Sequence, residues 1–427
     1  MKVLAPTGAA GRWWLPGSAA AAHWLRQRYR PGTRLALQAA SAPGTAALIQ
    51  GAWAAGMVLV PLSRRLPADQ AAALIQRARC LVLPEQLPAF SGDGDPGGAD
   101  DHDPASLGLL LFTSGTTGAP KAVQLSRRAL LAAAGAACLR LELTAADRWC
   151  ACLPLDHIGG IATILRSHLA GFTVHLHERF EAAAVRDDLD SGATGASLVP
   201  TMLHRLATAP WAPGVRVLLC GGGPLAPELA QRSFALGVAP CQTYGLSECA
   251  SQVCTLAPAE AANGIGTAGT PVAGMEVSLT QDGAIRVRGS SLMDGYLDDS
   301  APFDADGWFT TGDVGSFDAH GRLTVLGRHD EVIVTGGEKV APHLIEAHLE
   351  ALPGIAEAGV YGTADPEWGQ RVCAVLVAQG TPPPDALIRN HLAALADFQR
   401  PKQWRWISHL PRSSLGKLQR RRLATWL

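Results

Sequence analysis

Short apolar runs alternate along the first part of the chain with Ala-rich stretches of helical spacing. Thr45 to Ala55 follows a Pro-Gly pair and predicts a helix, and Met57 to Pro61 predicts the strand after it. A second helix is expected over Pro67 to Arg79, leading into a strand at Leu81 to Leu83. This alternation favours a largely parallel sheet with helices on its faces.

The apolar run Leu107 to Phe112 predicts another buried strand, and it ends abruptly in a polar loop. The loop consists of Thr113, Ser114, Gly115, Thr116, Thr117 and Gly118, with Lys121 shortly after it. Glycines let backbone N–H groups turn toward an anion, hydroxyls add donors without bulk, and the lysine adds positive charge. The spacing does not fit a Walker A loop. We interpret this stretch as a phosphate-binding loop; a solvated polar turn is the alternative.

Other predicted strands also end in residues that could line a pocket. Asp156 and His157 precede a Gly-Gly pair, Val215 to Cys220 runs into Gly221 to Gly223, and Tyr244 to Glu248 combines an aromatic ring, a hydroxyl and a carboxylate. Open α/β sheets bind ligands at the carboxyl ends of their strands, which favours a site here. A lone histidine is more often structural, and that alternative stays open for His157.

The second half of the chain has a different pattern. Asp282-Gly283 between two short alternating runs predicts a hairpin, within an antiparallel sheet or small barrel. After Arg328 the pattern predicts the strand Val332 to Val334, the helix Pro342 to Leu352, the strand Val372 to Ala378 and the helix Asp385 to Ala396. We therefore expect a large domain over 1–328 and a small α+β domain over 329–427. Lys402 onward is expected to be a basic tail or a polyphosphate-contacting segment.

Two further stretches have a clear local pattern, one of a helix and one of a loop. Ser126 to Leu141 predicts a helix that begins at a serine cap. Ser91 to Asp103 is rich in Gly and Asp and predicts a mobile loop; an acidic metal site is the alternative, but the spacing of a calcium loop is absent.

Composition narrows the class of protein. The chain has 427 residues, which favours two domains, and its 48% hydrophobic residues and net charge of −1 indicate a globular protein with no bias toward nucleic acid or anionic membranes. Its nine cysteines contain no C-x-x-C pair, so we expect neither a disulfide framework nor a structural zinc site. We expect the thiols to be in a reducing cytoplasm. No segment predicts insertion into a membrane, and the pattern does not indicate an oligomeric state.

Six motifs together resemble the adenylate-forming superfamily of acyl-CoA synthetases, luciferases and adenylation domains. They are TSGTTGAPK at 113–121, LPLDHIGG at 153–160, YGLSE at 244–248, TGD at 311–313, GRHDEVIVTGGEKVAP at 327–342 and PRSSLGK at 411–417. The resemblance implies an α/β fold with a large N-terminal domain of mixed sheets flanked by helices, a β-barrel-like part, and a small mobile α+β C-terminal domain.

The resemblance also implies a reaction in two steps. A carboxylate attacks the α-phosphate of ATP, with Mg²⁺ bound, and the thiol of coenzyme A then displaces AMP from the acyl adenylate. An anionic nucleophile approaches a polyanion only where cations and preorganised donors offset the repulsion. Lys417 matches the lysine that bridges carboxylate and phosphate, and Asp330 matches the hinge about which the small domain rotates, presenting the face near Gly336 and Gly337 to the thiol.

The remaining roles are carried over from the same motifs. Glu248 is expected to help catalysis by holding Mg²⁺ with Thr117, and the 113–118 loop with Lys121 to hold the β- and γ-phosphates. Ser247 would donate to the α-phosphate, and Asp313 and Arg328 would bind the ribose or phosphates. Tyr244 would stack on adenine beside Gly245, and the backbone of Gly221, Gly222 and Gly223 would lie along the other edge of the base.

Within the superfamily the chain looks most like 2-succinylbenzoate:CoA ligases of menaquinone biosynthesis, because YGLSE continues into CASQ and His157 is followed by a Gly-Gly pair and Leu-Arg-Ser. The implied acyl-site residues are His157, Gly160, Thr201 and Ser251, with His157 also a catalytic candidate. Arg166 could bind a second carboxylate or be a surface charge. Asp156 departs from the family pattern. Alternatives are another aryl- or alkanoyl-CoA ligase, or an adenylation enzyme that loads a carrier protein.

Overall fold

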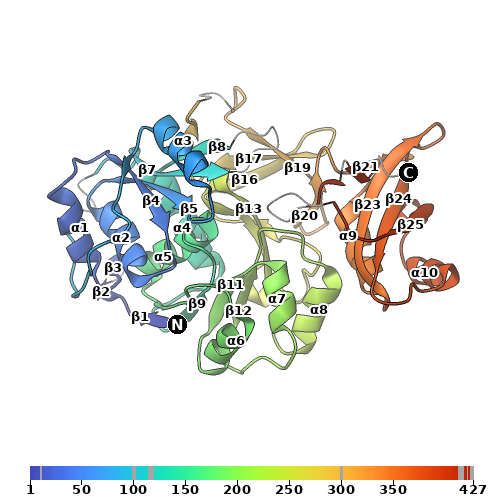
Figure 1. Cartoon of the computed structure of the whole chain (residues 1–427), viewed down its shortest axis with the longest axis horizontal. Helices are drawn as coiled ribbons and strands as arrows, with labels where there is room; N and C mark the ends of the chain where they lie inside the picture. The colour runs from blue at the N-terminus through green and yellow to red at the C-terminus, as the bar shows by residue number, and fades with distance from the viewer. Residues whose placement is uncertain are drawn as a thin grey trace. The chain divides into compact units, whose positions relative to one another are not determined.

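The computed structural model of the chain describes residues 1–9, 12–98, 102–113, 120–298, 302–411, 418–420 and 422–423. The chain divides into two compact units, Met1–Ser278 with Arg286–Thr310, and Leu279–Ile285 with Thr311–Leu427 (Figure 1). The second unit therefore begins ahead of His329, and the functional domain limit near that residue stays a prediction.

One sheet of the first unit has six strands in the order β18-β8-β7-β5-β4-β6. Strands β4 to β7 are parallel, whereas β8 is antiparallel to β7 and to β18. The strands are β4 (Arg34–Ala39), β5 (Val58–Ser63), β6 (Leu81–Val82), β7 (Leu107–Thr113), β8 (Lys121–Ser126) and β18 (Gly295–Tyr296). Three helices each precede one strand of this sheet in the sequence: α1 (Ser18–Arg26), α2 (Pro43–Ala54) and α3 (Ala68–Ala78). The strands and helices predicted in this region are confirmed.

Helix α2 has the sequence features of a helix buried on all sides. Pro43 occupies the first turn, where its missing N–H costs nothing, and every residue from Thr45 to Ala54 is buried. A Cβ added to Gly51 would lie 2.7 Å from the Cβ of Ala21, so glycine lets α2 pack closely against α1. A helix that is apolar on all sides is typical of a core.

A second sheet of the first unit has eight strands in the order β1-β10-β9-β11-β12-β13-β14-β15. The strands from β10 to β13 are parallel, and β1, β14 and β15 pair antiparallel with their neighbours. Its strands are β1 (Lys2–Leu4), β9 (Arg148–Ala151), β10 (Thr173–Leu176), β11 (Gly195–Leu198), β12 (Val217–Cys220), β13 (Cys241–Leu246), β14 (Ser251–Thr255) and β15 (Thr270–Pro271). A separate two-stranded sheet pairs β2 (Thr7–Ala9) with β3 (Arg12–Trp14).

The helices of this part are α4 (Arg127–Arg140), α5 (Ile158–Ala170), α6 (Ala182–Asp190), α7 (Pro200–Leu206) and α8 (Pro227–Ala235), with short 3₁₀ turns η1 (Ser247–Cys249) and η2 (Pro258–Glu260). The predicted serine cap is confirmed, because the Ser126 side chain accepts from the Ala129 N–H at the start of α4. The described residues of the predicted Ser91 to Asp103 loop contain no helix or strand.

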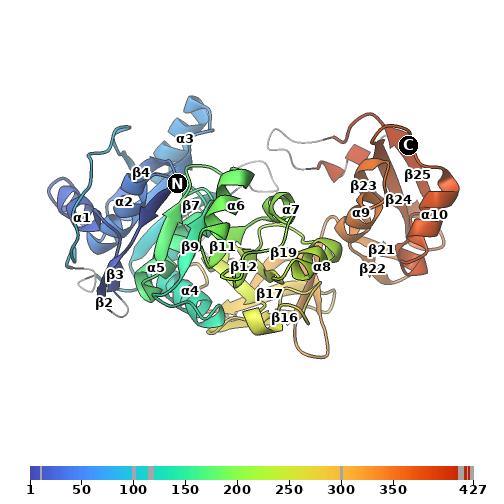
Figure 2. The same ribbon diagram turned by 90° about the horizontal axis from the view of Figure 1, so that it is seen from below.

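The two faces of the eight-stranded sheet differ in character. Cys150 and Cys152 point into an apolar core that α6, α7 and α8 complete, and Figure 2 shows β9, β11 and β12 between these helices and α5. On the opposite face Trp149 donates its Nε1–H to Ser197 Oγ at 3.1 Å, and the Arg166 guanidinium of α5 lies 5.2 Å from the Trp149 ring centroid. Alternation along the strands therefore separates an apolar face from one that contains polar groups.

Four antiparallel strands, β16 (Met275–Leu279), β17 (Ala284–Gly289), β19 (Phe309–Phe317) and β20 (Leu323–Arg328), form a sheet in this order and contribute residues to both units. The hairpin predicted around Asp282-Gly283 is confirmed. Gly283 has φ 77°, and the Thr280 N–H donates to the Ala284 carbonyl at 2.9 Å across the turn. The left-handed φ explains why glycine occupies that position.

The rest of the second unit is a sheet with helices, as predicted for the small α+β domain. Strand β24 (Gly369–Ala378) pairs with β21, β23 and β25, and β22 pairs with β21. The other elements are β21 (Ile333–Thr335), β22 (Glu338–Val340), β23 (Ile355–Asp365), β25 (Gln403–Ile407), α9 (Pro342–Glu350), α10 (Asp385–Leu392) and the 3₁₀ turn η3 (Asp397–Gln399). Residues of both helices and of the sheet share one apolar core.

The stretch from Lys402 is not simply a basic tail. Gln403–Ile407 forms β25, which is parallel to β24, and Trp404 and Trp406 pack against the core of the second unit. Further on, Arg420 donates to the Glu346 carboxylate of α9. The alternation of Trp404 and Trp406 with polar residues is the pattern of a half-buried strand, and the prediction missed it because it weighed only the basic charges of this stretch.

Candidate functional site

The predicted phosphate loop joins two antiparallel strands. Thr113 at the end of β7 and Lys121 at the start of β8 are register partners, and Thr113 Oγ1 donates to the Lys121 carbonyl at 3.5 Å. A strand that leads into this loop is thus confirmed. Ser114, Gly115, Thr116, Thr117 and Gly118 lie outside the described residues, so their roles stay predictions.

Lys121 and Glu248 both contact the side chain of Tyr296. Tyr296 Oη donates to Glu248 Oε1 at 2.8 Å, and Lys121 Nζ lies 4.7 Å from the centroid of the Tyr296 ring. Within the described part of the chain Glu248 forms no ion pair. A carboxylate oriented by a neutral donor, and not neutralised by a protein cation, suits a magnesium ligand.

Strand β13 carries Tyr244 and Gly245 into an irregular turn. The pairing of β13 with β14 shifts between these two residues, and a Cβ on Gly245 would lie 1.7 Å from the Ser251 carbonyl oxygen, so only glycine fits there. Ala250 and Ser251 have φ of 51° and 114°, which non-glycine residues rarely adopt. Such strain often occurs at functional sites, and here it directly follows η1, which begins at Ser247.

The three glycines after β12 lie close to neighbouring elements. A Cβ on Gly221 would lie 2.5 Å from Thr243 Cγ2, so glycine allows β13 to approach. Gly222 and Gly223 lie against Val199 and Pro200 at the start of α7. The exposed Thr201 occupies the first turn of the same helix, which places it near the glycine loop.

His157 is the residue before α5, and its side chain is 72% exposed. Its Nε2 lies 3.8 Å from Oδ1 of Asp156, whose side chain is only 9% exposed. That Asp156 oxygen has no hydrogen-bond partner in the described part of the chain. A Cβ on Gly160 would lie 2.1 Å from the Pro154 carbonyl oxygen, so this glycine lets the segment before α5 fold back against the helix.

Arg166 is not a surface charge, because it is 1% exposed within α5. Its guanidinium donates to Thr163 Oγ1 at 2.9 Å, to Ser197 Oγ at 3.0 Å and to the Gln252 side chain at 3.4 Å. Its Nε has no hydrogen-bond partner, and no carboxylate pairs with it among the described residues. Burial lowers the pKa of Arg166 to about 10, so it still carries its charge at neutral pH.

The ribose-binding candidates lie in the second unit, on neighbouring strands. Asp313 of β19 and Arg328 of β20 are register partners, and Arg328 Nη1 lies 3.5 Å from Asp313 Oδ1. A Cβ on Gly312 would lie 2.2 Å from Arg328 Nη2, so glycine leaves room for the guanidinium. A carboxylate and a guanidinium held side by side fit ribose hydroxyls and phosphate oxygens.

The remaining predicted residues also belong to the second unit. Asp330 lies in an exposed turn after β20, in which the N–H groups of Glu331 and Val332 both donate to the Arg328 carbonyl. Gly336 and Gly337 have φ of 58° and 85° between β21 and β22. Lys417 lies outside the described residues, so its role stays a prediction.

The family is identified by two matches that together cover most of the chain. The AMP-binding enzyme model matches residues 84–297, and the AMP-binding enzyme C-terminal domain model matches residues 344–417. The chain belongs to the AMP-binding enzyme family. The α/β fold and the adenylate-forming resemblance predicted from the sequence are confirmed.

Two relatives within the AMP-binding enzyme family are named 2-succinylbenzoate–CoA ligase. The one from Bacillus licheniformis is 39% identical over 74% of this chain and 69% of its own length. The one from Listeria monocytogenes is 36% identical over the same shares of the two chains.

Solved structures of AMP-binding enzymes have the same fold. The o-succinylbenzoate CoA synthetase of Bacillus subtilis in complex with the acyl-adenylate intermediate OSB-AMP has a TM-score of 0.81 and 28% identity, and the match covers 95% of this chain and 91% of that one. ATP-bound MatB from Rhodopseudomonas palustris also has a TM-score of 0.81, at 24% identity over 99% and 95% of the chains, and shows the fold alone.

Three polar contacts of this AMP-binding enzyme were not found from the sequence. Tyr296 binds Glu248, and Ser197 and Thr163 bind Arg166. Tyr296 and Ser197 are far from their partners in sequence and belong to no motif, so no local pattern signals them. Thr163 is three residues before Arg166 on α5, and that spacing could have been recognised.

Proposed function

We propose that the protein is an ATP-dependent 2-succinylbenzoate:CoA ligase of menaquinone biosynthesis. It would convert 2-succinylbenzoate, ATP and CoA into 2-succinylbenzoyl-CoA, AMP and pyrophosphate. The observation that carries this proposal is the 39% identity to a 2-succinylbenzoate–CoA ligase over three quarters of the chain. Structures of the Bacillus subtilis synthetase with the acyl-adenylate intermediate OSB-AMP, and with ATP and magnesium ion, support a reaction through an acyl adenylate.

In the first step the chain has to hold a polyanion and a carboxylate together. Glu248, oriented by Tyr296, is the described carboxylate best suited to the metal of Mg-ATP, with Thr117 as the proposed second ligand. Mg²⁺ would supply positive charge to the phosphate oxygens. Lys121 and the 113–118 loop would bind the β- and γ-phosphates, and Ser247 would donate to the α-phosphate. Preorganised donors of this kind lower the barrier because they need no reorientation during the reaction.

Each unit, taken by itself, contains candidate residues for binding the nucleoside. Tyr244 with Gly245 and the glycines 221–223 would bind adenine in the first unit, because these residues lie at the carboxyl ends of β13 and β12. Asp313 would accept hydrogen bonds from the ribose hydroxyls, and Arg328 would bind a ribose or phosphate oxygen. The two side chains already lie side by side on β19 and β20.

Arg166 supports a dicarboxylic acid as substrate. A buried guanidinium that contacts neutral groups only carries a large desolvation cost, which an incoming carboxylate would offset. In this proposal the first carboxylate of 2-succinylbenzoate is adenylated near His157, and the second binds Arg166. Ser251, Thr201 and Gly160 would line the acyl site between them.

The second step needs a thiol in place of pyrophosphate. In the proposed cycle the small domain rotates about Asp330, withdraws Lys417 and presents the segment near Gly336 and Gly337 to CoA. The nine cysteines are all free, which supports action in the cytoplasm. Among the described residues, no helix combines the length and the apolar character that crossing a membrane requires.

A substrate panel tests the acid and the acceptor. Pyrophosphate release would be measured with 2-succinylbenzoate, benzoate and a medium-chain fatty acid, each with and without CoA. We expect the highest kcat/KM for 2-succinylbenzoate and thioester formation only with CoA. Equal rates for benzoate or the fatty acid would overturn the substrate, and thioester transfer only to a carrier protein would overturn the acceptor.

The role of Lys417 is tested separately. Lys417→Ala should reduce adenylate formation by several orders of magnitude, because the charge between carboxylate and α-phosphate is lost. Thioester formation from synthetic 2-succinylbenzoyl-AMP and CoA should stay close to that of the unmodified protein. Equal loss of both steps would contradict the role, and Lys402→Ala provides a control in the same region, since Lys402 pairs with Asp397.

A further inference from the structure

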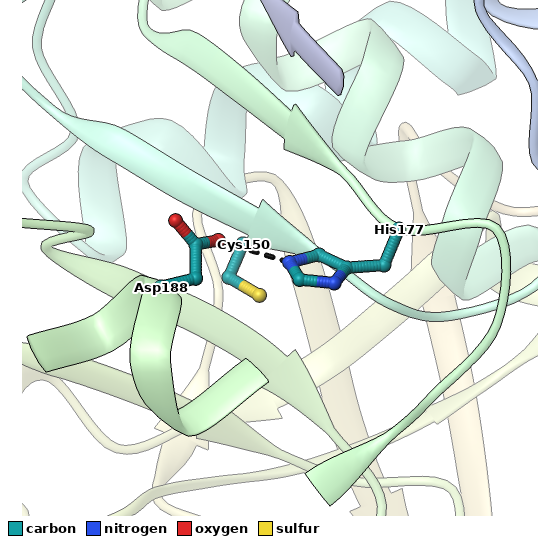
Figure 3. Close-up of side chains that lie close together, drawn as sticks. All are labelled: Cys150, His177 and Asp188. Atoms are coloured by element: carbon teal, nitrogen blue, oxygen red, sulfur yellow. Dashed lines mark hydrogen bonds and ion pairs between the residues drawn. The ribbon is translucent and has the colours of Figure 1, made fainter. Parts of the chain in front are cut away.

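Three side chains with metal-binding atoms meet in the core of the first unit. Cys150 lies on β9, His177 follows β10 and Asp188 lies on α6, and all three are buried (Figure 3). Strands β9 and β10 are parallel, and the His177 N–H donates to the Ala151 carbonyl at 3.0 Å. The cluster therefore joins two strands to the helix that covers them.

Asp188 is the centre of the cluster. Its Oδ2 lies 3.0 Å from His177 Nε2, and its Oδ1 lies 2.5 Å from Nδ1 of His175, the register partner of Cys150. Asp188 is buried, and no lysine or arginine pairs with it in the part of the chain that the structure describes.

The distances suit a small cation. Ligand atoms of Cys150, His177 and Asp188 all lie within 4.8 Å of one another, and the hydrogen bond between His177 Nε2 and Asp188 Oδ2 is 3.0 Å long. In a tetrahedral zinc site neighbouring ligand atoms are roughly 3.5 Å apart, which falls between these values. Small side-chain shifts would bring the three atoms to bonding distance.

The charges and atom types also favour zinc. A thiolate and a carboxylate together neutralise a divalent cation, so a zinc complex would leave no net charge in the apolar core. Sulfur, imidazole nitrogen and carboxylate oxygen are the atoms that bind Zn²⁺ in proteins, whereas Mg²⁺ and Ca²⁺ prefer oxygen alone. The same side chains without a metal would be a hydrogen-bonded network, in which Asp188 accepts from both imidazoles.

We propose that Cys150, His177 and Asp188 form a buried zinc site, in which His175 orients Asp188 through its second oxygen. The fourth position belongs to a water molecule. The site stabilises the junction of β9, β10 and α6. Since β9 leads directly into the segment with Asp156 and His157, it also supports the acyl site, although the inference does not depend on the substrate.

The test uses the full chain, stripped with a chelator and titrated with Co²⁺ and then Zn²⁺. We expect one metal per chain, a thiolate-to-cobalt charge-transfer band that Zn²⁺ removes, and a thermal midpoint that rises with zinc. The absence of a cobalt–thiolate band and of zinc binding by the unmodified chain would overturn the proposal and leave the hydrogen-bonded network. This measurement stays decisive even if a variant fails to fold.

Variants identify the ligands. Cys150→Ser should abolish the charge-transfer band, and His175→Gln should weaken zinc binding by roughly 10- to 100-fold without removing the band, as expected for a residue that orients a ligand. Cys220→Ser is the matched control, because Cys220 is a buried thiol in the same apolar core but outside the cluster. Loss of the band in Cys220→Ser, or its retention in Cys150→Ser, would overturn the assignment.

Discussion

Arg166 hydrogen-bonds Thr163, Ser197 and Gln252 and lies on the Trp149 ring, so its charge is surrounded by neutral groups. Most buried charges in proteins are paired, because an isolated ion loses its hydration without compensation. Asp147 and Asp188 in the same unit follow that rule, with Arg216 and with two histidines respectively. Arg166 departs from this rule, as does the buried Arg127, which forms no ion pair among the described residues. We assign Arg166 to substrate recognition.

Arg166→Met should therefore affect substrates differently. We expect kcat/KM for 2-succinylbenzoate to fall roughly 30- to 1,000-fold, which corresponds to about 2–4 kcal/mol in activation free energy. The smaller activity toward benzoate should stay nearly constant. Steady-state kinetics on both acids, with thermal unfolding as a check on folding, would measure this. An equal loss for both acids would indicate that Arg166 only stabilises the fold.

His343 provides a prediction for pH dependence in the second unit. Burial lowers its pKa to about 4, and the nearby Arg420 acts in the same direction. An unfolded histidine titrates near 6.5, so between about pH 6.5 and 4 the unfolded chain binds more protons and the folded state loses stability as pH falls. The ring keeps some solvent contact, so we expect a loss of at most about 2 kcal/mol.

Urea unfolding of the native chain and of His343→Gln at pH 7 and pH 4.5 would measure this effect. The native chain should lose more stability than the variant across this interval, because glutamine does not titrate. Equal losses in the two proteins would mean that His343 is solvated in the folded state.

Among the elements, the parallel strands of the eight-stranded sheet are tied together at the ends where they begin. Asp147 before β9 accepts from Thr144 N at 2.8 Å, from Thr194 Oγ1 ahead of β11 at 2.8 Å and from Arg216 ahead of β12 at 2.5 Å. Burial alone would raise the pKa of Asp147. The hydrogen bonds outweigh burial, so the pKa lies below its usual value. One carboxylate thus aligns three strands whose opposite ends carry the candidate site.

Asp147→Asn should destabilise the first unit by about 1.5–3 kcal/mol, because it removes the charge from a buried pair while Arg216 keeps part of its hydration. Asp190→Asn is the control, since Asp190 pairs with Arg186 one helical turn away and is 44% exposed. That change should cost no more than about 0.5 kcal/mol. Urea titrations of the three proteins would compare them, and similar losses for both variants would contradict the role of Asp147.

For the molecule as a whole, the proposed cycle requires the backbone near Asp330 to change conformation between the two half-reactions. Asp330→Pro fixes φ at that residue and restricts His329 before it. We expect adenylate formation to be retained and thioester formation to fall by roughly two orders of magnitude, because the second geometry is not reached. Separate single-turnover measurements of pyrophosphate and thioester would show the difference.

Asp330→Ala is the matched variant, because it removes the same side chain and leaves the backbone free. It should affect thioester formation less than the proline does. Full activity of Asp330→Pro in both steps would show that this residue does not act as the hinge.

Local sequence determined much of this protein. The strand β7, the buried helix α2, the Ser126 cap of α4 and the hairpin at Gly283 each follow from residues within one or two turns of the chain. The six motifs also identified the family, because each combines turn-forming glycines with side chains that bind phosphate or ribose. These features are readable because neighbouring residues produce them.

Contacts between distant residues were decided only by the tertiary structure. The register of β9, β10 and β11 determines that Trp149 and Ser197 share one face with Arg166, and that Cys150 and His175 share the other. A shift of one residue would exchange these faces, and no short stretch of sequence encodes the pairing. For the same reason the sequence argued against structural zinc, whereas the fold brings Cys150, His177 and Asp188 together from two strands and a helix.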